Sequence, residues 1–112
     1  MEEKFLLLND KNESNILEFM PSDEIILKIA EYFQNFSDLT RLKIITCLSM
    51  SDMCVNDLSV ILKINQTTVS HQLKILRAQD IVEFVRDGKI VKYTLKHKVV
   101  NDIMLNVVEN VC

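Results

Sequence analysis

The sequence predicts a mainly α-helical domain that carries one β-hairpin. Apolar residues recur at helical spacing along most of the chain, and after Asp80 the spacing changes to the strict alternation of strands. The only glycine, Gly88, stands with Asp87 between two alternating runs, and Asp-Gly is a strong hairpin signal. A chain of 112 residues with one glycine and one proline has room for one compact domain and few linker residues.

A boundary is expected near the start of the chain, where Pro21 and Ser22 interrupt the helical pattern. Residues 1–21 are predicted to form an N-terminal arm or a short helix. Residues 22–112 are predicted to form the main domain, because the apolar pattern is continuous from there onward.

About five helices are expected, each with an apolar stripe on one side. Ser22, Ser37 and Asn65 are placed to cap the first, second and fourth, since their side chains accept hydrogen bonds from free amides. The inward positions of the second, third and fourth helices are Leu42, Ile45, Leu48, Leu58, Ile61, Leu62, Val69, Leu73 and Leu76. The helices cover about residues 23–36, 38–49, 55–63, 66–78 and 98–111.

The third and fourth helices are short and meet over a tight turn, which is the arrangement of a helix-turn-helix. The hairpin follows directly, with Gly88 at its tip. The predicted fold class is therefore mainly α with a β-hairpin wing, a winged helix-turn-helix.

The fourth helix has a polar face that suits the major groove of DNA. Polar side chains recur at helical spacing opposite the apolar residues, at Thr67, Ser70, His71 and Lys74. Such side chains reach base edges or phosphates. An ordinary solvated helix face is the simpler interpretation, but it leaves unexplained the preceding short helix and the hairpin, whose turn is flanked by Arg86 and Lys89. The whole pattern favours DNA binding.

The charge distribution agrees with this interpretation better than the net charge does. The net charge is −3, which argues against a nucleic-acid partner. Between Lys74 and Lys98, however, seven basic residues outnumber three acidic ones, whereas the first 24 residues are strongly acidic. The basic charge is thus concentrated in one contiguous third of the chain, where it can meet phosphates.

The last helix predicts a homodimer. Its apolar positions are Val99, Val100, Ile103, Met104, Val107, Val108 and Val111. This stripe is wider than one side of so small a domain needs, so we expect it to be buried against a second chain.

Two segments resemble the ArsR/SmtB family of repressors. They are SDLTRLKIITCL, from Ser37, and DMCVNDLSVILKINQTTVSHQLKILRAQDIVEFVRDGKIVKYTL, which ends at Leu95. Within them, the segment VSHQLKILR followed by the DGK turn is a specific sign of resemblance to this family. The resemblance implies a dimeric winged-helix repressor that binds a roughly palindromic operator in double-stranded DNA and leaves it when an inducer binds. It also implies that the first and last helices form the dimer interface.

Together, the residue pattern and the resemblance give a set of candidate DNA-binding residues. On the fourth helix these are Gln66, Thr67, Thr68, Ser70, His71, Gln72 and Lys74, and on the wing they are Arg86 and Lys89.

The resemblance to metal-sensing members of the family is incomplete. Cys54 stands at the cap of the third helix, where a thiolate is favoured, with Asp57 three positions on as in a capping box. The family's thiolate site resembles a C-V-C-D-L run, but here Asn56 replaces the second cysteine. At the family's other metal site only His97 is a possible ligand. Soft metals want three or four ligands, so no metal cofactor is predicted and Cys54 is only a weak candidate.

A thiol switch is the preferred hypothesis for sensing. Some members of the family resemble switches that pair a cysteine on the second helix with one near the end of the last helix. Cys112 matches the second position, and Cys47 lies one residue from the first. The simpler interpretation, which stays open, is that Cys47 is a small buried hydrophobe and Cys112 has no special role.

Several other classes are excluded or ranked lower. The apolar runs are too short to span a membrane, and the acidic first residues do not resemble a signal peptide, so a cytoplasmic location is expected. Three widely spaced cysteines do not form a disulfide framework. No nucleophile with a base, glycine-rich loop or carboxylate cluster points to an enzyme. The remaining rival is a winged-helix module that binds proteins and not DNA, which the acidic net charge favours.

Overall fold

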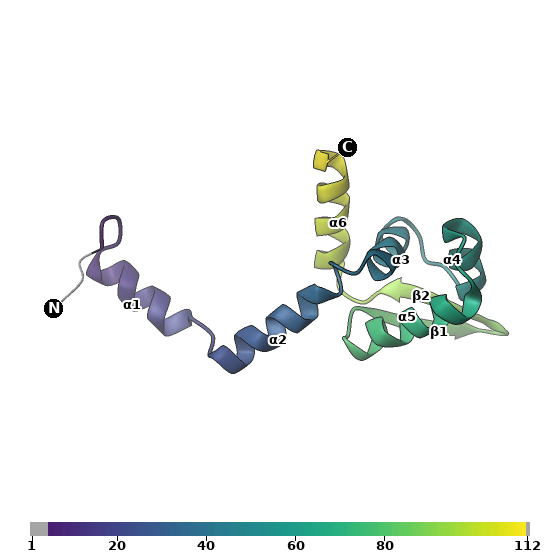
Figure 1. Cartoon of the computed structure of the whole chain (residues 1–112), viewed down its shortest axis with the longest axis horizontal. Coiled ribbons are helices and arrows are strands. Elements are labelled where there is room, and N and C mark those ends of the chain that lie inside the picture. Colours follow the sequence, from purple (N-terminus) through teal and green to yellow (C-terminus); the bar gives the residue numbers. More distant parts are fainter. Residues whose placement is uncertain (1–4, 112) are drawn as a thin grey trace. The chain divides into compact units, whose positions relative to one another are not determined.

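The computed structural model describes residues 5–111. Within this range the chain forms six helices and two strands (Figure 1), which are α1 (Asp10–Phe19), α2 (Asp23–Gln34), α3 (Leu39–Met50), α4 (Val55–Leu62), α5 (Gln66–Ala78), β1 (Val82–Asp87), β2 (Ile90–Leu95) and α6 (Lys98–Val111). The predicted class, mainly α with one hairpin, is confirmed. None of the described helices is long and apolar enough to cross a membrane.

The chain divides into two compact units, Met1–Glu31 and Tyr32–Cys112, and each is described by itself. The division falls inside α2, whereas the boundary predicted at residues 21 and 22 falls in the link between α1 and α2.

The first unit contains the short helix that was one of two alternatives for the start of the chain. Asn12 N–H donates to Asn9 Oδ1 at 2.9 Å, and Asn9 N–H donates back to Asn12 Oδ1 at 3.4 Å. This reciprocal pair is a capping box, which fixes the start of α1. Ser22 caps α2 as predicted, because its Oγ accepts from Ile25 N–H at 3.3 Å. Neither α1 nor α2 has a buried residue.

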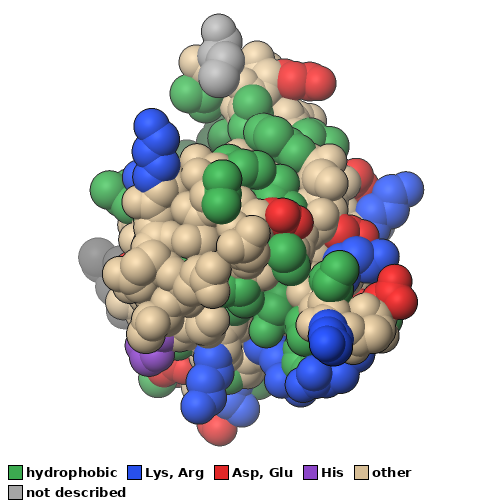
Figure 2. Space-filling view, turned by 90° about the vertical axis from the view of Figure 1, so that its right-hand side faces the viewer, with side chains coloured by type: hydrophobic (Ala, Val, Ile, Leu, Met, Phe, Trp, Pro, Cys, Tyr) green, Lys and Arg blue, Asp and Glu red, His purple; other side chains and the backbone are tan. Residues whose placement is uncertain are grey.

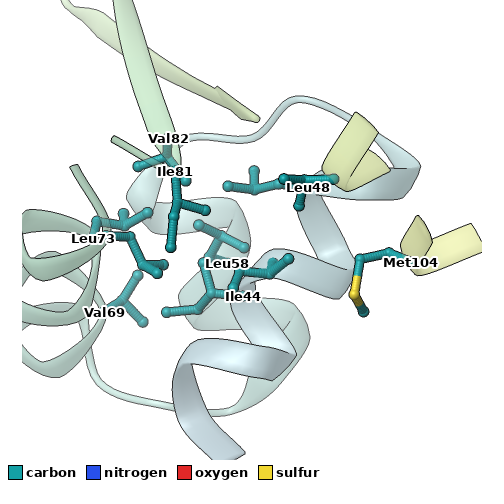
Figure 3. Packing of buried hydrophobic residues seen from close by; sticks show 11 residues of the cluster. Ile44, Leu48, Leu58, Val69, Leu73, Ile81, Val82 and Met104 are labelled. Atoms are coloured by element: carbon teal, nitrogen blue, oxygen red, sulfur yellow. The ribbon is translucent and has the colours of Figure 1, made fainter. Parts of the chain in front are cut away.

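The second unit is built around one apolar cluster to which α3, α4, α5, the hairpin and α6 all contribute (Figure 3). Its buried members are Ile44, Ile45, Leu48, Leu58, Val69, Leu73, Leu76, Ile81, Val82, Val100 and Met104. Most of the predicted inward positions lie in or against this cluster, but Ile61 is 57% exposed. The prediction for Ile61 was wrong because α4 is only 8 residues long and buries Leu58 alone.

The caps of α3 and α5 set where these helices begin. The predicted cap of α3 is wrong by one residue, since Asp38 Oδ1 accepts from Arg41 N–H at 2.9 Å. Ser37 instead closes the turn after α2, where its N–H donates to Gln34 O at 3.0 Å. Asn65 caps α5 as predicted, because its Oδ1 accepts from Thr68 N–H at 2.8 Å.

The hairpin is antiparallel, with Val82 opposite Leu95 and Asp87 opposite Ile90. Its two loop residues are therefore Gly88 and Lys89, and not the Asp-Gly pair that signalled the turn in the sequence. Gly88 has φ +63°, whereas Lys89 does not have a positive φ, which is the pattern of a type II′ turn.

A third segment joins the hairpin at one residue pair, which the sequence did not indicate. Tyr93 N–H donates to Met53 O at 2.8 Å, and Met53 N–H donates to Tyr93 O at 3.2 Å. The chain just before α4 is thereby attached to β2.

Candidate nucleic-acid interface

The exposed face of α5 carries the polar side chains that the sequence predicted there. Val69, Leu73 and Leu76 are fully buried on the opposite side of the helix. The exposed residues are Thr67, Ser70, His71 and Lys74. None of these four side chains forms a hydrogen bond with another residue of the described range 5–111, so their polar atoms are available to a ligand.

Three other predicted residues of α5 are placed differently. Gln66 is exposed, but its Nε2 donates to Asn56 Oδ1 on α4 at 2.9 Å. Gln72 is half-buried, and its Oε1 accepts from Arg41 Nη1 on α3 at 3.0 Å. Thr68 is half-buried as well. The amides of Gln66 and Gln72 thus bond within the protein, where they hold α5 against its neighbouring helices.

Arg41 was not singled out from the sequence, yet it connects two parts of this interface. Its side chain is only 17% exposed. Nη2 lies 3.8 Å from Asp38 Oδ2 at the cap of α3, while Nη1 donates to Gln72. Local spacing gives no signal for this contact, because Arg41 and Gln72 are 31 residues apart in the chain.

The wing residues Arg86 and Lys89 are exposed, as a contact with DNA requires. Figure 2, which faces the tip of the hairpin, shows several Lys and Arg side chains gathered on this side of the molecule. Arg86 Cζ lies 5.8 Å from the ring centroid of Phe84, two residues earlier on the same strand.

The cations of α5 and of the hairpin tip have no acidic partner among the described residues, unlike the two lysines Lys92 and Lys96. Lys92 pairs with Asp52, at 4.0 Å, and Lys96 pairs with Asp80. In contrast, no carboxylate within residues 5–111 forms an ion pair with the cations on α5 and near the hairpin tip, which are Lys74, Arg77, Arg86 and Lys89. Their charge is not neutralised inside the protein, so it remains available to phosphates.

An ion-pair cluster connects the end of α5 with the start of α6. Asp80 has φ +63° directly after α5, and its carboxylate accepts a hydrogen bond from Lys96 and lies 3.3 Å from His97 Nε2. The bond from Lys96, followed by that from His97, lowers the pKa of Asp80, and the same bond raises the pKa of Lys96. His97 is exposed at the junction of β2 and α6, where the sequence analysis expected it.

The cysteines do not assemble a metal site in the described part of the chain. Cys54 is the N-cap residue of α4, and its N–H donates to Asp57 Oδ2 at 3.4 Å, as expected of a helix cap. No three His, Cys, Asp or Glu side chains within residues 5–111 are grouped to hold a metal ion. Cys47 is half-buried, and burial raises the pKa of its thiol. Cys112 lies outside the described residues.

An apolar groove of about 740 Å³ runs along α6. From α6 only Val100 and Met104 are buried in the core, while Ile103 and Val107 remain about half exposed. The groove is lined by Tyr32, Phe33, Phe36, Leu42, Thr46, Val99, Val100, Ile103, Met104, Val107, Val108 and Val111. The wide apolar stripe predicted for the last helix is therefore present and largely uncovered.

The second unit thus combines a helix-turn-helix, a β-hairpin wing, an exposed polar face on α5 and cations without acidic partners. These features define a winged helix-turn-helix regulator, a class of DNA-binding protein.

Comparisons with known proteins identify the family. Residues 38–83 match the sequence profile described as bacterial regulatory protein, arsR family. The chain is 40% identical over 68 residues to the transcriptional repressor SmtB homolog of Synechocystis sp., which covers 61% of this chain and 52% of that protein. It is 36% identical over 81 residues to the cadmium resistance transcriptional regulatory protein CadC of Listeria innocua, and this match covers 70% of the present chain and 68% of CadC. The chain belongs to the arsR family of bacterial regulatory proteins.

A solved structure supports the same fold. The homodimeric winged helix-turn-helix DNA-binding domain from Mycobacterium bovis aligns with a TM-score of 0.69 at 23% identity, covering 82% of this chain and 90% of that domain. The predicted family and winged-helix class are confirmed, and the family agrees with the prediction of a regulator and not an enzyme. The chain spans about half the length of the Synechocystis relative.

Proposed function

We propose that the chain is a transcriptional repressor that binds a roughly palindromic operator in double-stranded DNA as a homodimer. The observation that carries this proposal is the exposed face of α5, where four polar side chains have no partner within residues 5–111. The wing adds cations that form no ion pair within the same range. A regulator that binds operator DNA in this way acts in the cytoplasm, which is the location we propose.

Within this proposal the candidate DNA-binding residues have three different roles. Thr67, Ser70 and His71 read base edges in the major groove, and Lys74 on the same helix, with Arg86 and Lys89 on the wing, binds phosphates. Gln66, Thr68 and Gln72 position α5, because two of them bond to α4 and α3 and the third is half-buried.

The groove along α6 supports the homodimer. Apolar surface of this extent marks an interface on a small protein, and a second copy of the chain brings a matching surface through a two-fold axis. The similar domain from Mycobacterium bovis is homodimeric. We propose that α2 and α6 form the interface, which places two α5 helices on two half-sites of the operator.

The decisive measurement is fluorescence anisotropy with a labelled duplex from the region upstream of the chain's own gene, at two salt concentrations. We expect tighter binding to this duplex than to a scrambled duplex, and affinity that falls steeply with salt. Absence of specific binding at low salt would favour the rival, a winged-helix module that binds only proteins.

A histidine pair provides a matched control for the role of α5. His71→Ala should weaken binding to the upstream duplex by about tenfold, since a base contact is worth about 1–3 kcal/mol. His97→Ala should leave it nearly unchanged, because His97 lies outside α5 and bonds with Asp80. Equal effects of the two substitutions would argue against α5 as the reader.

For the inducer we propose a thiol-reactive species that acts on Cys47 and Cys112. The raised pKa of Cys47 predicts slow reaction at neutral pH, because the thiolate is the reactive form. Mild oxidation should give a Cys47–Cys112 peptide in mass spectrometry and release the DNA. Undiminished release in Cys47→Ser would overturn this mechanism, and release of wild-type protein by cadmium or arsenite without oxidant would support a metal site at Cys54 instead.

A further inference from the structure

We infer that Arg77 is a further DNA-contacting residue, which the ring of Phe84 holds in position to bind the phosphate backbone between α5 and the wing. The inference rests on the proposed DNA binding and adds two residues that the exposed stripe of α5 does not include. Arg77 is the contacting residue, and Phe84 is a positioning residue.

Phe84 lies where the apolar core of the second unit ends. Alternation along β1 places Val82, Phe84 and Arg86 on one face of the hairpin. Along this face burial decreases, from a buried Val82 through a half-buried Phe84 to an exposed Arg86. On β2 the ring of Tyr93 packs against Phe84, with 5.7 Å between the centroids. The ring of Phe84 is therefore held by its neighbours and still reaches the surface.

The guanidinium of Arg77 is stacked on this ring. Arg77 is in the last turn of α5, three residues after Lys74, and its Cζ lies 4.2 Å from the centroid of Phe84. A guanidinium over an aromatic face is held by the ring quadrupole, while the donors at its edge remain free. Stacking thus fixes where the donors of Arg77 lie without consuming them.

A second guanidinium approaches the same ring. Arg86 Cζ is 5.8 Å from the centroid of Phe84, so a single ring gathers one cation from α5 and one from the wing. Neither Arg77 nor Arg86 forms an ion pair with a carboxylate of residues 5–111. Two like charges held near each other without a counter-ion repel in the free protein. An anion that contacts both guanidinium groups offsets that repulsion, so the pair favours an anionic ligand.

The position of this pair matches the path of a DNA strand. When α5 occupies the major groove and the wing reaches the neighbouring groove, the sugar-phosphate strand that separates the grooves runs past the junction of α5 and β1. Arg77 belongs to α5 and Arg86 belongs to β1, the two elements that meet at this junction. Guanidinium groups bind phosphate through two parallel hydrogen bonds. The pair would therefore grip one strand and set the distance between helix and wing.

The first test compares Arg77→Gln with Lys98→Gln by anisotropy with the upstream duplex and a scrambled duplex. Lys98 is a cation on α6 that forms no ion pair within residues 5–111. Arg77→Gln should weaken binding to both duplexes by about tenfold, because a phosphate contact carries no sequence information. It should also reduce the slope of log affinity against log salt by about one. Arg77→Lys should keep the wild-type slope, and Lys98→Gln should change neither quantity.

The second test addresses Phe84. Phe84→Leu keeps an apolar side chain but removes the aromatic face, so it should weaken binding to both duplexes in the wild-type background. In the Arg77→Gln background the same substitution should have a smaller effect, because the residue that the ring positions has been removed. Equal effects in both backgrounds would overturn the positioning role.

The outcomes separate this inference from the proposed function. If wild-type protein binds the upstream duplex and His71→Ala weakens it, but Arg77→Gln changes neither affinity nor salt slope, only the inference is wrong. A loss of thermal stability in Arg77→Gln with an unchanged salt slope also overturns it, since Arg77 would then only attach the hairpin to α5. If wild-type protein binds neither duplex, both proposals fail.

Discussion

The helices α5 and α6 have similar length, 13 and 14 residues, and both are amphipathic, but they use their apolar faces differently. The apolar face of α5 is completed within the chain, since Val69, Leu73 and Leu76 are fully buried. Of the wider apolar face of α6, only Val100 and Met104 are buried. The difference teaches that α5 presents a polar surface to its ligand, whereas α6 presents an apolar surface that a second chain has to cover.

The largest expected effect concerns the buried face of α5. Leu73→Ala should lower the free energy of unfolding by about 2–5 kcal/mol, because it leaves a cavity in the core. Urea unfolding measures this loss. The control is Ile61→Ala on α4, which is 57% exposed and should lose less than about 1 kcal/mol. Equal losses of unfolding free energy in the two variants would contradict the burial of the apolar face of α5 within the chain.

A substitution on α6 tests the uncovered face. Ile103→Glu places a charge in the groove and should convert the dimer to a monomer in sedimentation velocity. Affinity for the upstream duplex should fall about 100-fold or more, since the two half-sites are no longer bound by linked subunits. Leu105 is on the same helix but does not line the groove, so the Leu105→Glu variant should remain dimeric. A dimeric Ile103→Glu would place the interface elsewhere.

A smaller effect distinguishes positioning from reading on α5. Gln72→Ala removes the acceptor of Arg41 Nη1 and should lower the free energy of unfolding by about 1 kcal/mol, with less loss of DNA affinity than His71→Ala. Gln79→Ala, at the exposed end of the same helix, is the control. If Gln72→Ala loses as much affinity as His71→Ala at unchanged stability, Gln72 reads bases directly.

The smallest expected effect lies where α5 and α6 are connected. Because the hydrogen bond from Lys96 lowers the pKa of Asp80, this carboxylate stabilises the fold above its unfolded pKa, and the contribution disappears as the pH falls through the lowered pKa. Asp80→Asn should therefore melt slightly below the wild-type protein near neutral pH and equal it in acid. Thermal melts across this range measure the difference, which is small because the pair is exposed. A difference that persists in acid would have another cause.

The sequence predicted those parts of the site that depend on neighbours along one element. The exposed stripe at Thr67, Ser70 and His71 follows from helical spacing, and Asn65 caps α5 as expected. The predicted cap of α3 was wrong by one residue. Ser37 and Asp38 are both good cap residues, and only the turn after α2, which uses Ser37, decides between them.

Asn56, the residue that weakens the case for a metal site, has a structural role in the fold. Asn56 stands where the family's second thiolate would be, and the sequence indicated only that a ligand was missing there. In the fold its Oδ1 accepts a hydrogen bond from Gln66, the first residue of α5. This contact crosses the turn of the helix-turn-helix, so no single helical pattern contains it.

By itself the sequence determined the order of the helices, the hairpin and the polar face of α5, because side-chain direction repeats with a fixed period within each element. Only the tertiary structure decided which of those polar groups are free. In the folded chain Gln72 accepts a hydrogen bond from Arg41, Ile61 is exposed, and the guanidinium of Arg77 lies over the ring of Phe84. The physical reason is that these contacts join different elements, and their geometry depends on how the elements pack and not on the spacing within any one of them.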